Sequence, residues 1–308
     1  MGGAFVGVAD DASALYWNPA GLAAGSYFSL VLDGSVRRAV PQDGQQGSRQ
    51  SSFFLGLTTP ALGLTYYRLH QAIAAPYSLL APTDTGASSR NTTGATVVRL
   101  NSLTTHHAGV TLVQSVVPGV AVGATLKMVR GFAASDVAAS PTAKGALEDS
   151  TLPAVGASRF DVDLGIMGST SKLKAGLTLR NLREPEFTSQ NGDVLKLERQ
   201  LRAGVSWAAT GTWLVAADVD VLTSQDAFGE RRDAALGVEG KIARRATVRS
   251  GVKFNLSPAN DIAVGGSAAG YTAGGSFAVT PAVLLDAVAV TGGDRSGRGW
   301  GLSARFVY

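Results

Sequence analysis

The sequence predicts an all-β protein, an antiparallel up-and-down transmembrane β-barrel of about fourteen strands, from three observations. Apolar and polar residues alternate with a period of two along most of the chain. Short and long connections alternate between these runs. Charged residues make up only 16% of the 308 residues, whereas a typical soluble domain has roughly 25%.

The hydropathy of the chain is compatible with a barrel and not with membrane-spanning helices. No apolar run approaches the roughly 18 residues that such a helix needs. A closed barrel is the other structure in which the backbone satisfies its own hydrogen bonds in lipid. Its apolar side chains occupy every second position, so the averaged hydropathy of each strand stays moderate.

The alternation is clearest over residues 213–221, where Trp213 and Val219 lie on one face and Asp218 and Asp220 on the other. A soluble β-protein would alternate too, with its apolar face in a core. Fourteen strands in one sheet would then need a second layer, and no amphipathic helix is predicted to supply it. The strands are expected at residues 26–37, 51–58, 61–70, 104–116, 120–131, 158–168, 172–183, 198–209, 212–223, 231–242, 246–256, 261–271, 282–291 and 299–308.

The connections are the second signal. Tight turns are expected at residues 58–60, 117–119 and 210–211. Long polar connections are expected at residues 38–50, 71–103, 132–157, 184–197 and 224–230. Short turns at one rim and long loops at the other are typical of outer-membrane barrels, with the long loops outside the cell.

Charged residues on the inward face are expected to pair with one another inside the barrel, because an unpaired buried charge is costly. Arg180, Arg202 and Lys241 are the expected partners of the inward carboxylates. The predicted luminal polar network consists of Asp161, Asp163, Arg180, Arg202, Asp218, Asp220, Glu239 and Lys241.

The N-terminal sequence carries a motif. Residues 2–5 read Gly-Gly-Ala-Phe, residues 10–13 Asp-Asp-Ala-Ser, and residues 18–22 Asn-Pro-Ala-Gly-Leu. Pro19 fixes its own φ angle and biases Asn18 away from the helical region, so a turn is expected there. From the residues alone, a capped helix followed by a turn, without a gating role, stays open.

This motif resembles the N-terminal segment of the FadL/TodX superfamily of hydrophobic-compound transporters, and most closely its PorV/PorQ-like branch. Further landmarks of that branch begin at Asp163, Gly176, Arg199 and Ala217. The resemblance implies that residues 1–25 form a hatch in the lumen and residues 26–308 the transmembrane barrel. Members normally carry a signal peptide before the motif, so residue 1 is expected to follow a processing site or an internal start. The resemblance implies hatch or gating roles for Asp10, Asp11, Asn18, Pro19, Ala20 and Gly21.

The final strand carries a second motif. Its outward face ends on an aromatic residue and has apolar residues at every second position before it. This pattern resembles the insertion signal that the outer-membrane barrel assembly machinery reads, although an ordinary last strand would alternate as well. The residues of the expected signal are Trp300, Leu302, Phe306 and Tyr308.

No catalytic chemistry is predicted. The chain has no cysteine, which excludes thiolate metal sites and disulfides. His106 and His107 are neighbours in a strand and point to opposite faces, and together with His70 they are expected to be solvated residues at the rim. A nucleophile formed by His107 with Ser102 or Ser115 has nothing beyond proximity to support it. We therefore expect no enzyme activity, no metal and no cofactor.

Two functions remain in play for a barrel in the cell outer membrane, surrounded by its lipids. The first is the passive transport of small hydrophobic, fatty-acid-like molecules through a plugged barrel. The second is a PorV-like role without transport, in which the barrel is a partner of a protein secretion or surface-attachment system. The net charge of +4 is scattered, so nucleic-acid binding is not expected.

Overall fold

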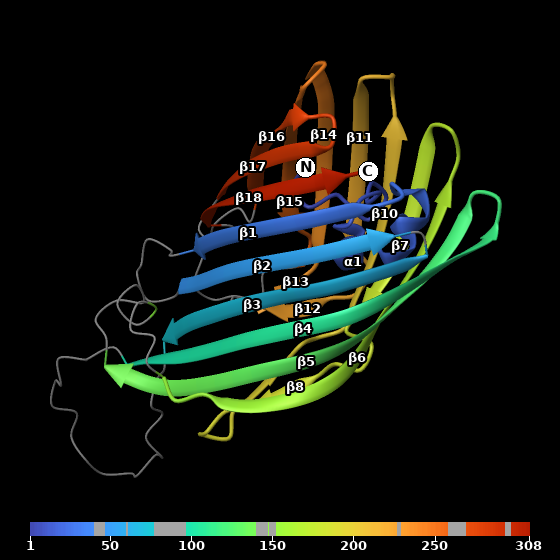
Figure 1. Cartoon of the computed structure of the whole chain (residues 1–308). Coiled ribbons are helices and arrows are strands. Elements are labelled where there is room, and N and C mark those ends of the chain that lie inside the picture. Colours follow the sequence, from blue (N-terminus) through green and yellow to red (C-terminus); the bar gives the residue numbers. More distant parts are fainter. Residues whose placement is uncertain are drawn as a thin grey trace, which may run out of the picture.

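In the computed structural model, fourteen strands form one closed antiparallel barrel (Figure 1). Each strand pairs with its neighbours in the chain order, and β1 closes the barrel on β18, with Asp33 opposite Ser303. The predicted fold class is therefore confirmed. No helix among the described residues is long and apolar enough to cross a membrane. The structure describes residues 1–39, 47–59, 61–76, 97–139, 147, 152–226, 229–257, 269–292 and 297–308.

The strands of the barrel fall close to the predicted ranges. They are β1 Ser29–Ala39, β2 Gly47–Thr59, β3 Leu62–Pro76, β4 Val97–Val117, β5 Val120–Ala139, β6 Val155–Ser169, β7 Leu173–Arg180, β10 Gln200–Ala208, β11 Trp213–Asp220, β14 Asp233–Ala243, β15 Ala246–Asn255, β16 Gly270–Thr280, β17 Val283–Gly292 and β18 Arg298–Val307. Two small hairpins lie in the connections: β8 Glu186–Thr188 with β9 Val194–Lys196, and β12 Ser224–Asp226 with β13 Gly229–Arg231. Before β1 come a short helix, α1 Ala14–Trp17, and a 3-10 helix, η1 Pro19–Ala24.

One predicted strand is wrong in position. The strand expected at residues 261–271 is β16, which occupies Gly270–Thr280. Residues 258–268 lie outside the described residues. Glycine and alanine fill so many positions around residues 264–275 that the apolar alternation is faint there. Within β16, the outward face is marked by Tyr271, Phe277 and Val279.

The alternation of turn lengths is confirmed. The expected turns at residues 58–60, 117–119 and 210–211 separate β2 from β3, β4 from β5 and β10 from β11. The expected long connections are shorter than predicted at three places, because β1 and β2 extend into residues 38–50, β3 and β4 into residues 71–103, and β5 and β6 into residues 132–157. The ends of β3 and β5 are rich in alanine, and Ala72, Ala74, Val98 and Leu100 form a small apolar cluster on one face, so the strands continue where the alternation in the sequence is weak. Ser89 and Ser140, inside those connections, lie outside the described residues.

The two faces of the wall have opposite character. On β5, Thr125, Lys127 and Val129 point inward and are at most 1% exposed, whereas Leu126 and Met128 point outward and are more than half exposed. The exterior is lined in this way by apolar side chains, among them Leu64, Val110, Leu112, Leu164, Val205, Val215, Leu236, Phe277, Leu285 and Leu302. This arrangement, with polar groups buried inside and apolar groups outside, is that of a transmembrane barrel.

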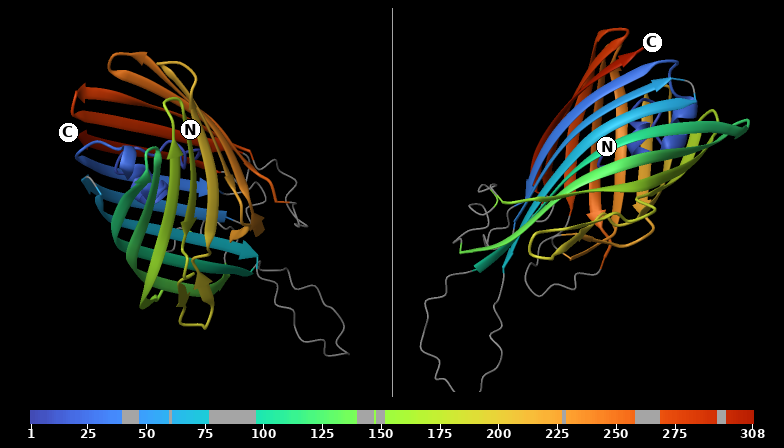
Figure 2. Two further views of the ribbon diagram at one scale, coloured as in Figure 1. Left: turned by 90° about the vertical axis from the view of Figure 1, so that its right-hand side faces the viewer. Right: turned by 60° about the horizontal axis from the view of Figure 1, so that its bottom comes forward.

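The hydrophobic core lies inside the barrel, between the first 25 residues, called the N-terminal segment below, and the inner wall. Figure 2 shows this segment, in dark blue, enclosed by the strands. Leu15 packs against Val31, Phe54 and Tyr67 of β1, β2 and β3. At the other end of the segment, Met1 and its neighbours pack against the inner faces of β11 and β14.

The apolar exterior generates the first prediction. Leu164→Arg should lower the free energy of unfolding by about 2–4 kcal/mol if the residue meets the middle of the bilayer, because the new charge would lie in hydrocarbon. Gln50→Arg, which adds the same side chain at a position lining the interior, should have a much smaller effect. Urea titration of the protein folded into lipid vesicles measures both, and equal losses would contradict a lipid-facing exterior.

Candidate functional site: the N-terminal segment and the luminal cavity

Asn18 and Pro19 join the two short helices of the N-terminal segment. The Asn18 Oδ1 atom accepts a hydrogen bond of 3.1 Å from the Ala20 amide, and Pro19 occupies the first position of η1. This is an N-cap followed by a proline that needs no amide partner. The Asn18 Nδ2 atom donates to the carbonyl oxygens of Val6 and Ile166, both at 3.2 Å. Asn18, which is fully buried, therefore ties both halves of the segment to the wall.

Glycines in the wall let the segment come close. A Cβ atom on Gly165 would lie 2.2 Å from Asn18 Oδ1, and one on Gly123 would lie 2.6 Å from the Ala20 amide nitrogen. Within the segment, a Cβ atom on Gly21 would lie 2.2 Å from the carbonyl oxygen of Ala9. Glycine inside a strand commonly marks such a close backbone approach.

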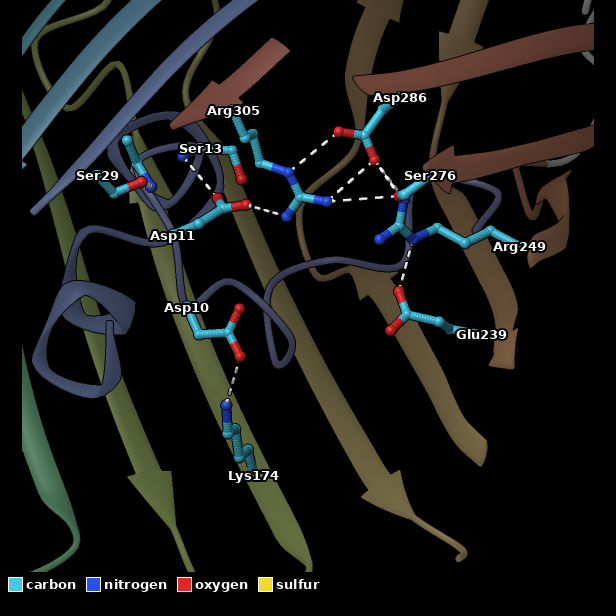
Figure 3. Close-up of polar contacts among 11 residues, drawn as sticks. Asp10, Asp11, Ser13, Ser29, Lys174, Glu239, Arg249, Ser276, Asp286 and Arg305 are labelled. Carbon is cyan, nitrogen blue, oxygen red and sulfur yellow. Dashed lines mark hydrogen bonds and ion pairs between the residues drawn. The ribbon is translucent and has the colours of Figure 1, made fainter. Parts of the chain in front are cut away.

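Asp11 connects the segment to a chain of charged residues on the wall (Figure 3). One carboxylate oxygen of Asp11 accepts a hydrogen bond from the Ser13 amide at 2.8 Å, and the other accepts from Arg305 at 2.6 Å. Arg305 also donates to Asp286 at 3.0 Å, and Arg249 donates to Asp286 at 2.8 Å. Asp10 forms a more exposed pair with Lys174 at 3.2 Å, and such exposed pairs stabilise little.

The chain of charges ends at Glu239, which accepts a hydrogen bond of 2.5 Å from Arg249. Sequence reasoning predicted Glu239 as part of the network but missed Arg249 and Arg305. Both arginines stand at inward positions of their strands, and Arg249 lies directly opposite Glu239 in the register of β14 and β15. The strand register, which the alternation alone does not reveal, decides which charges meet.

Asp161 and Asp163 pair with a residue that sequence reasoning also missed. Lys127 lies 3.0 Å from Asp161 and 2.7 Å from Asp163, and donates to Asn181 Oδ1 at 2.9 Å. Lys127 faces Asp161 in the register of β5 and β6. Lys127 lies two residues from both Thr125 and Val129, which point inward. This spacing is the sequence signal that could have placed Lys127 on the inner face.

Of the other predicted members of the network, some bind as expected and some do not. Arg202 pairs with Asp220 at 2.6 Å, as expected, and the two residues face each other across β10 and β11. Asp218 accepts hydrogen bonds from the backbone amides of Phe5 and Val6, at 2.8 and 2.9 Å, and so holds the N-terminal segment. Lys241 is exposed where the register of β14 shifts near the rim, so its predicted pairing inside the barrel is wrong.

Arg180 is not paired as predicted. Among the residues that the structure describes, no carboxylate forms an ion pair with its guanidinium group. The guanidinium carbon instead lies 3.8 Å from the centre of the Tyr16 ring. The charge of Arg180 lowers the pKa of Tyr16 from its usual value, because this effect outweighs burial of the ring, which raises the pKa.

The histidine prediction is wrong for one residue. His107 is only 1% exposed and stacks on Tyr67, with the ring centres 4.1 Å apart. Tyr67, which also packs in the cluster around Leu15, covers one face of the His107 ring, and the strand pattern could not indicate this contact. His106 points to the other face and hydrogen-bonds the Tyr66 hydroxyl at 2.8 Å, and His70 bonds a threonine hydroxyl on β4.

A hairpin narrows the barrel on the side of the long connections. Phe187, on β8, is fully buried against Val129 and Ala133 on the inner face of β5. A Cβ atom on Gly131 would lie 2.4 Å from the Phe187 ring. Because these partners are inward residues, the β8–β9 hairpin folds into the lumen. Sequence reasoning treated residues 184–197 only as a loop.

A cavity of about 760 Å³ lies between the N-terminal segment and the wall. One side is aromatic and the other is charged. The aromatic side contains Phe5, Tyr16, Trp17, Phe54 and Tyr67, and the charged side contains Arg202, Asp220, Arg249, Asp286 and Arg305. Cavities of roughly 300–1,000 Å³ that combine apolar walls with a few polar groups are typical ligand sites.

The residues of the expected insertion signal lie together on the outward face of β18. Trp300, Leu302, Phe306 and Tyr308 are all exposed there. Their arrangement agrees with the alternation seen in the sequence. Their role in insertion stays a prediction.

The glycine contacts generate the second prediction. Gly165→Ala should lower the free energy of unfolding by about 1–3 kcal/mol, because the new methyl group would overlap Asn18 and overpacking has such costs. It should also speed hydrogen exchange in residues 5–20. Gly168→Ala, on the same strand with no atom within 4 Å of the added Cβ, is the matched control. Indistinguishable behaviour of the two variants would mean that the segment does not pack tightly on β6.

Similar proteins share the barrel. The CymD monoaromatic hydrocarbon channel superposes with a TM-score of 0.65 over 100% of this chain and 95% of its own, at 14% identity. A FadL homologue from Pseudomonas aeruginosa has a TM-score of 0.60 at 13% identity and covers 98% of this chain and 95% of its own. The toluene transporter TodX from P. putida has a TM-score of 0.60 at 13% identity and covers 96% and 94%.

At these identities the likeness establishes the fold, so the resemblance to FadL/TodX barrels is confirmed at that level. The PorV/PorQ-like branch stays a prediction. No curated protein matches the sequence. One protein family, the F plasmid transfer operon protein TraF, matches residues 15–220. Because this match spans more than half of the chain, from α1 to the end of β11, the chain belongs to the TraF family of the F plasmid transfer operon.

Proposed function

We propose that this protein is an outer-membrane channel through which small hydrophobic molecules pass passively, with the N-terminal segment as a hatch. The observation that carries the proposal is the cavity of about 760 Å³, which has an aromatic side formed largely by the segment itself. The barrels with which it shares its fold include a hydrocarbon channel and a toluene transporter, and this likeness supports the same class of cargo. A passive channel needs no catalytic group, in keeping with the expectation that the protein is not an enzyme.

The N-terminal segment is held in the lumen by several separate polar anchors. They join Asp11 to Arg305, two amides to Asp218, Asn18 to Ile166, Gly2 to Thr272, Gly7 to Ser206, Asp10 to Lys174 and Ala12 to Ser29. Between these anchors, glycines of the wall meet the segment, and apolar side chains pack, with Leu15 against Val31 and Tyr67. A molecule that enters the cavity touches both the segment and the wall, so its binding can shift the position of the segment.

The apolar exterior supports a location in the outer membrane, where lipids would surround the barrel. The outward residues of β18 support recognition by the barrel assembly machinery. We place the long connections outside the cell and the short turns in the periplasm, as is usual for these barrels.

A role without transport is the alternative, and two observations favour it. The family is described by a plasmid transfer operon, which points to a multiprotein apparatus. The β8–β9 hairpin also narrows the lumen beside β5. A secretion or surface-attachment protein would then be the partner, as in the PorV-like hypothesis, and the barrel would serve as its docking component.

Replacing Asn18 and Pro19 with alanine tests the hatch. The variant should insert and remain heat-modifiable, because closure depends on the strand ladder. It should nevertheless change the rate at which toluene enters proteoliposomes, because the Asn18 bonds to Val6 and Ile166 are lost. Gly168→Ala serves as the control with an undisturbed hatch. An unchanged toluene rate in a folded variant would favour the partner-binding function.

The orientation is tested with single cysteines on whole cells. Gln190→Cys, in the β8–β9 connection, should react with a membrane-impermeant maleimide, because that connection belongs to the long set. Gly211→Cys, in the turn between β10 and β11, should be protected until the outer membrane is opened. Both positions are exposed. The opposite pattern would invert the topology.

A further inference from the structure

Three buried hydrogen-bonding groups of the cavity lining have no partner among the described residues, and besides the Ser13 hydroxyl of the segment two of them belong to the wall. The Nε atom of Arg180 and the hydroxyl of Tyr67 have no hydrogen-bond partner among the described residues. Both side chains line the cavity, and Tyr67 is only 2% exposed. An unsatisfied buried donor costs free energy, so two of them at one cavity wall indicate a site for an acceptor.

Arg180 differs from the other cations of the cavity because its possible partners are occupied. Asp163, the nearest carboxylate by strand order, is bound by Lys127 through both oxygens, at 2.7 and 2.8 Å. Asp220 is held in the same way by Arg202, at 2.6 and 2.9 Å. Arg180 is thus a cation inside the barrel without a paired carboxylate, at the point where β7 ends.

The surroundings of these two groups are aromatic. Tyr16 lies between them, with Arg180 over its ring and Tyr67 in an edge contact at 5.6 Å. Trp17 continues the same surface, 5.3 Å from Tyr16, and Phe5 lies 5.7 Å from Trp17. Aromatic rings in such arrangements bind another ring by stacking or edge contacts.

We infer that this part of the cavity binds the oxyanion of a small aromatic acid. The carboxylate accepts hydrogen bonds from Arg180 and Tyr67, and its ring packs on Tyr16 and Trp17. A neutral hydrocarbon of the same shape fills the apolar surface but leaves both donors unpaired, so the acid binds more tightly. The inference rests on the proposed channel function and narrows its cargo to molecules with an apolar body and an oxyanion.

Phenylacetate and toluene separate the contribution of the aromatic ring to binding from that of the carboxylate, because both have the ring and only phenylacetate has the carboxylate. Isothermal titration calorimetry of the whole chain in lipid nanodiscs measures binding of each. Arg180→Gln should weaken phenylacetate roughly 10- to 100-fold, the range expected for a hydrogen-bonded charge. Tyr67→Phe should weaken it roughly 2- to 10-fold, as for a neutral hydrogen bond. Toluene affinity should stay within about twofold in both, since it makes neither bond.

The double variant Arg202→Gln/Asp220→Asn is the matched control. It removes a cation from the same cavity together with its partner and keeps the net charge, so phenylacetate affinity should be nearly unchanged. Should Arg180→Gln fail to fold, Arg180→Lys keeps the charge but lacks the Nε donor, and it should still lose several-fold of the phenylacetate affinity.

Equal phenylacetate affinity in the wild type and a folded Arg180→Gln variant would overturn the inference. So would toluene binding that is as tight as phenylacetate binding in the wild type. The channel function is judged separately, by toluene flux into proteoliposomes. Toluene flux without Arg180-dependent phenylacetate binding would support the channel function and contradict the acid site. Arg180-dependent phenylacetate binding without toluene flux would support the acid site and contradict the channel function.

Discussion

The inside of this barrel depends on a row of glycines at which the wall comes into backbone contact with the N-terminal segment. The row continues across neighbouring strands, because Gly123 faces Gly165, Gly176 faces Gly204, and Gly237 faces Gly251. A side chain at any of these positions would overlap the segment or its anchors. These glycines let residues 1–20 lie directly against the inner wall. The position of the segment then determines where the cavity, the core and the buried charges lie.

The strands were predictable because each has one face toward lipid and one toward a crowded polar interior. Apolar and polar side chains therefore alternate with a period of two. Thirteen of the fourteen strands fall near the expected ranges, and only β16 is displaced. The sites were less predictable, because alternation reports the face of a residue and not its cross-strand partner. Lys127 with Asp161, and Arg249 with Glu239, are direct register pairs that no single strand reveals.

The contacts of the N-terminal segment illustrate a second limit. The Asn-Pro element predicted a turn, and the structure has one with the expected cap. Nothing in residues 1–25 indicated that Asp218 would hold two of their amides. These contacts join residues 213 and 212 positions apart in the chain, and they require the strands to close around the segment.

The charges of the interior are compatible with the proposed acid site. Most luminal cations are neutralised by a carboxylate across the strand, so they give the cavity polarity without attracting a free anion strongly. Arg180 has no such partner among the described residues, and it stands beside Tyr16 in the aromatic part of the lining. Gln200 on β10 faces Arg180 and points inward. A carboxylate at this position would neutralise Arg180. An uncharged Gln200 keeps the Arg180 charge available to a ligand.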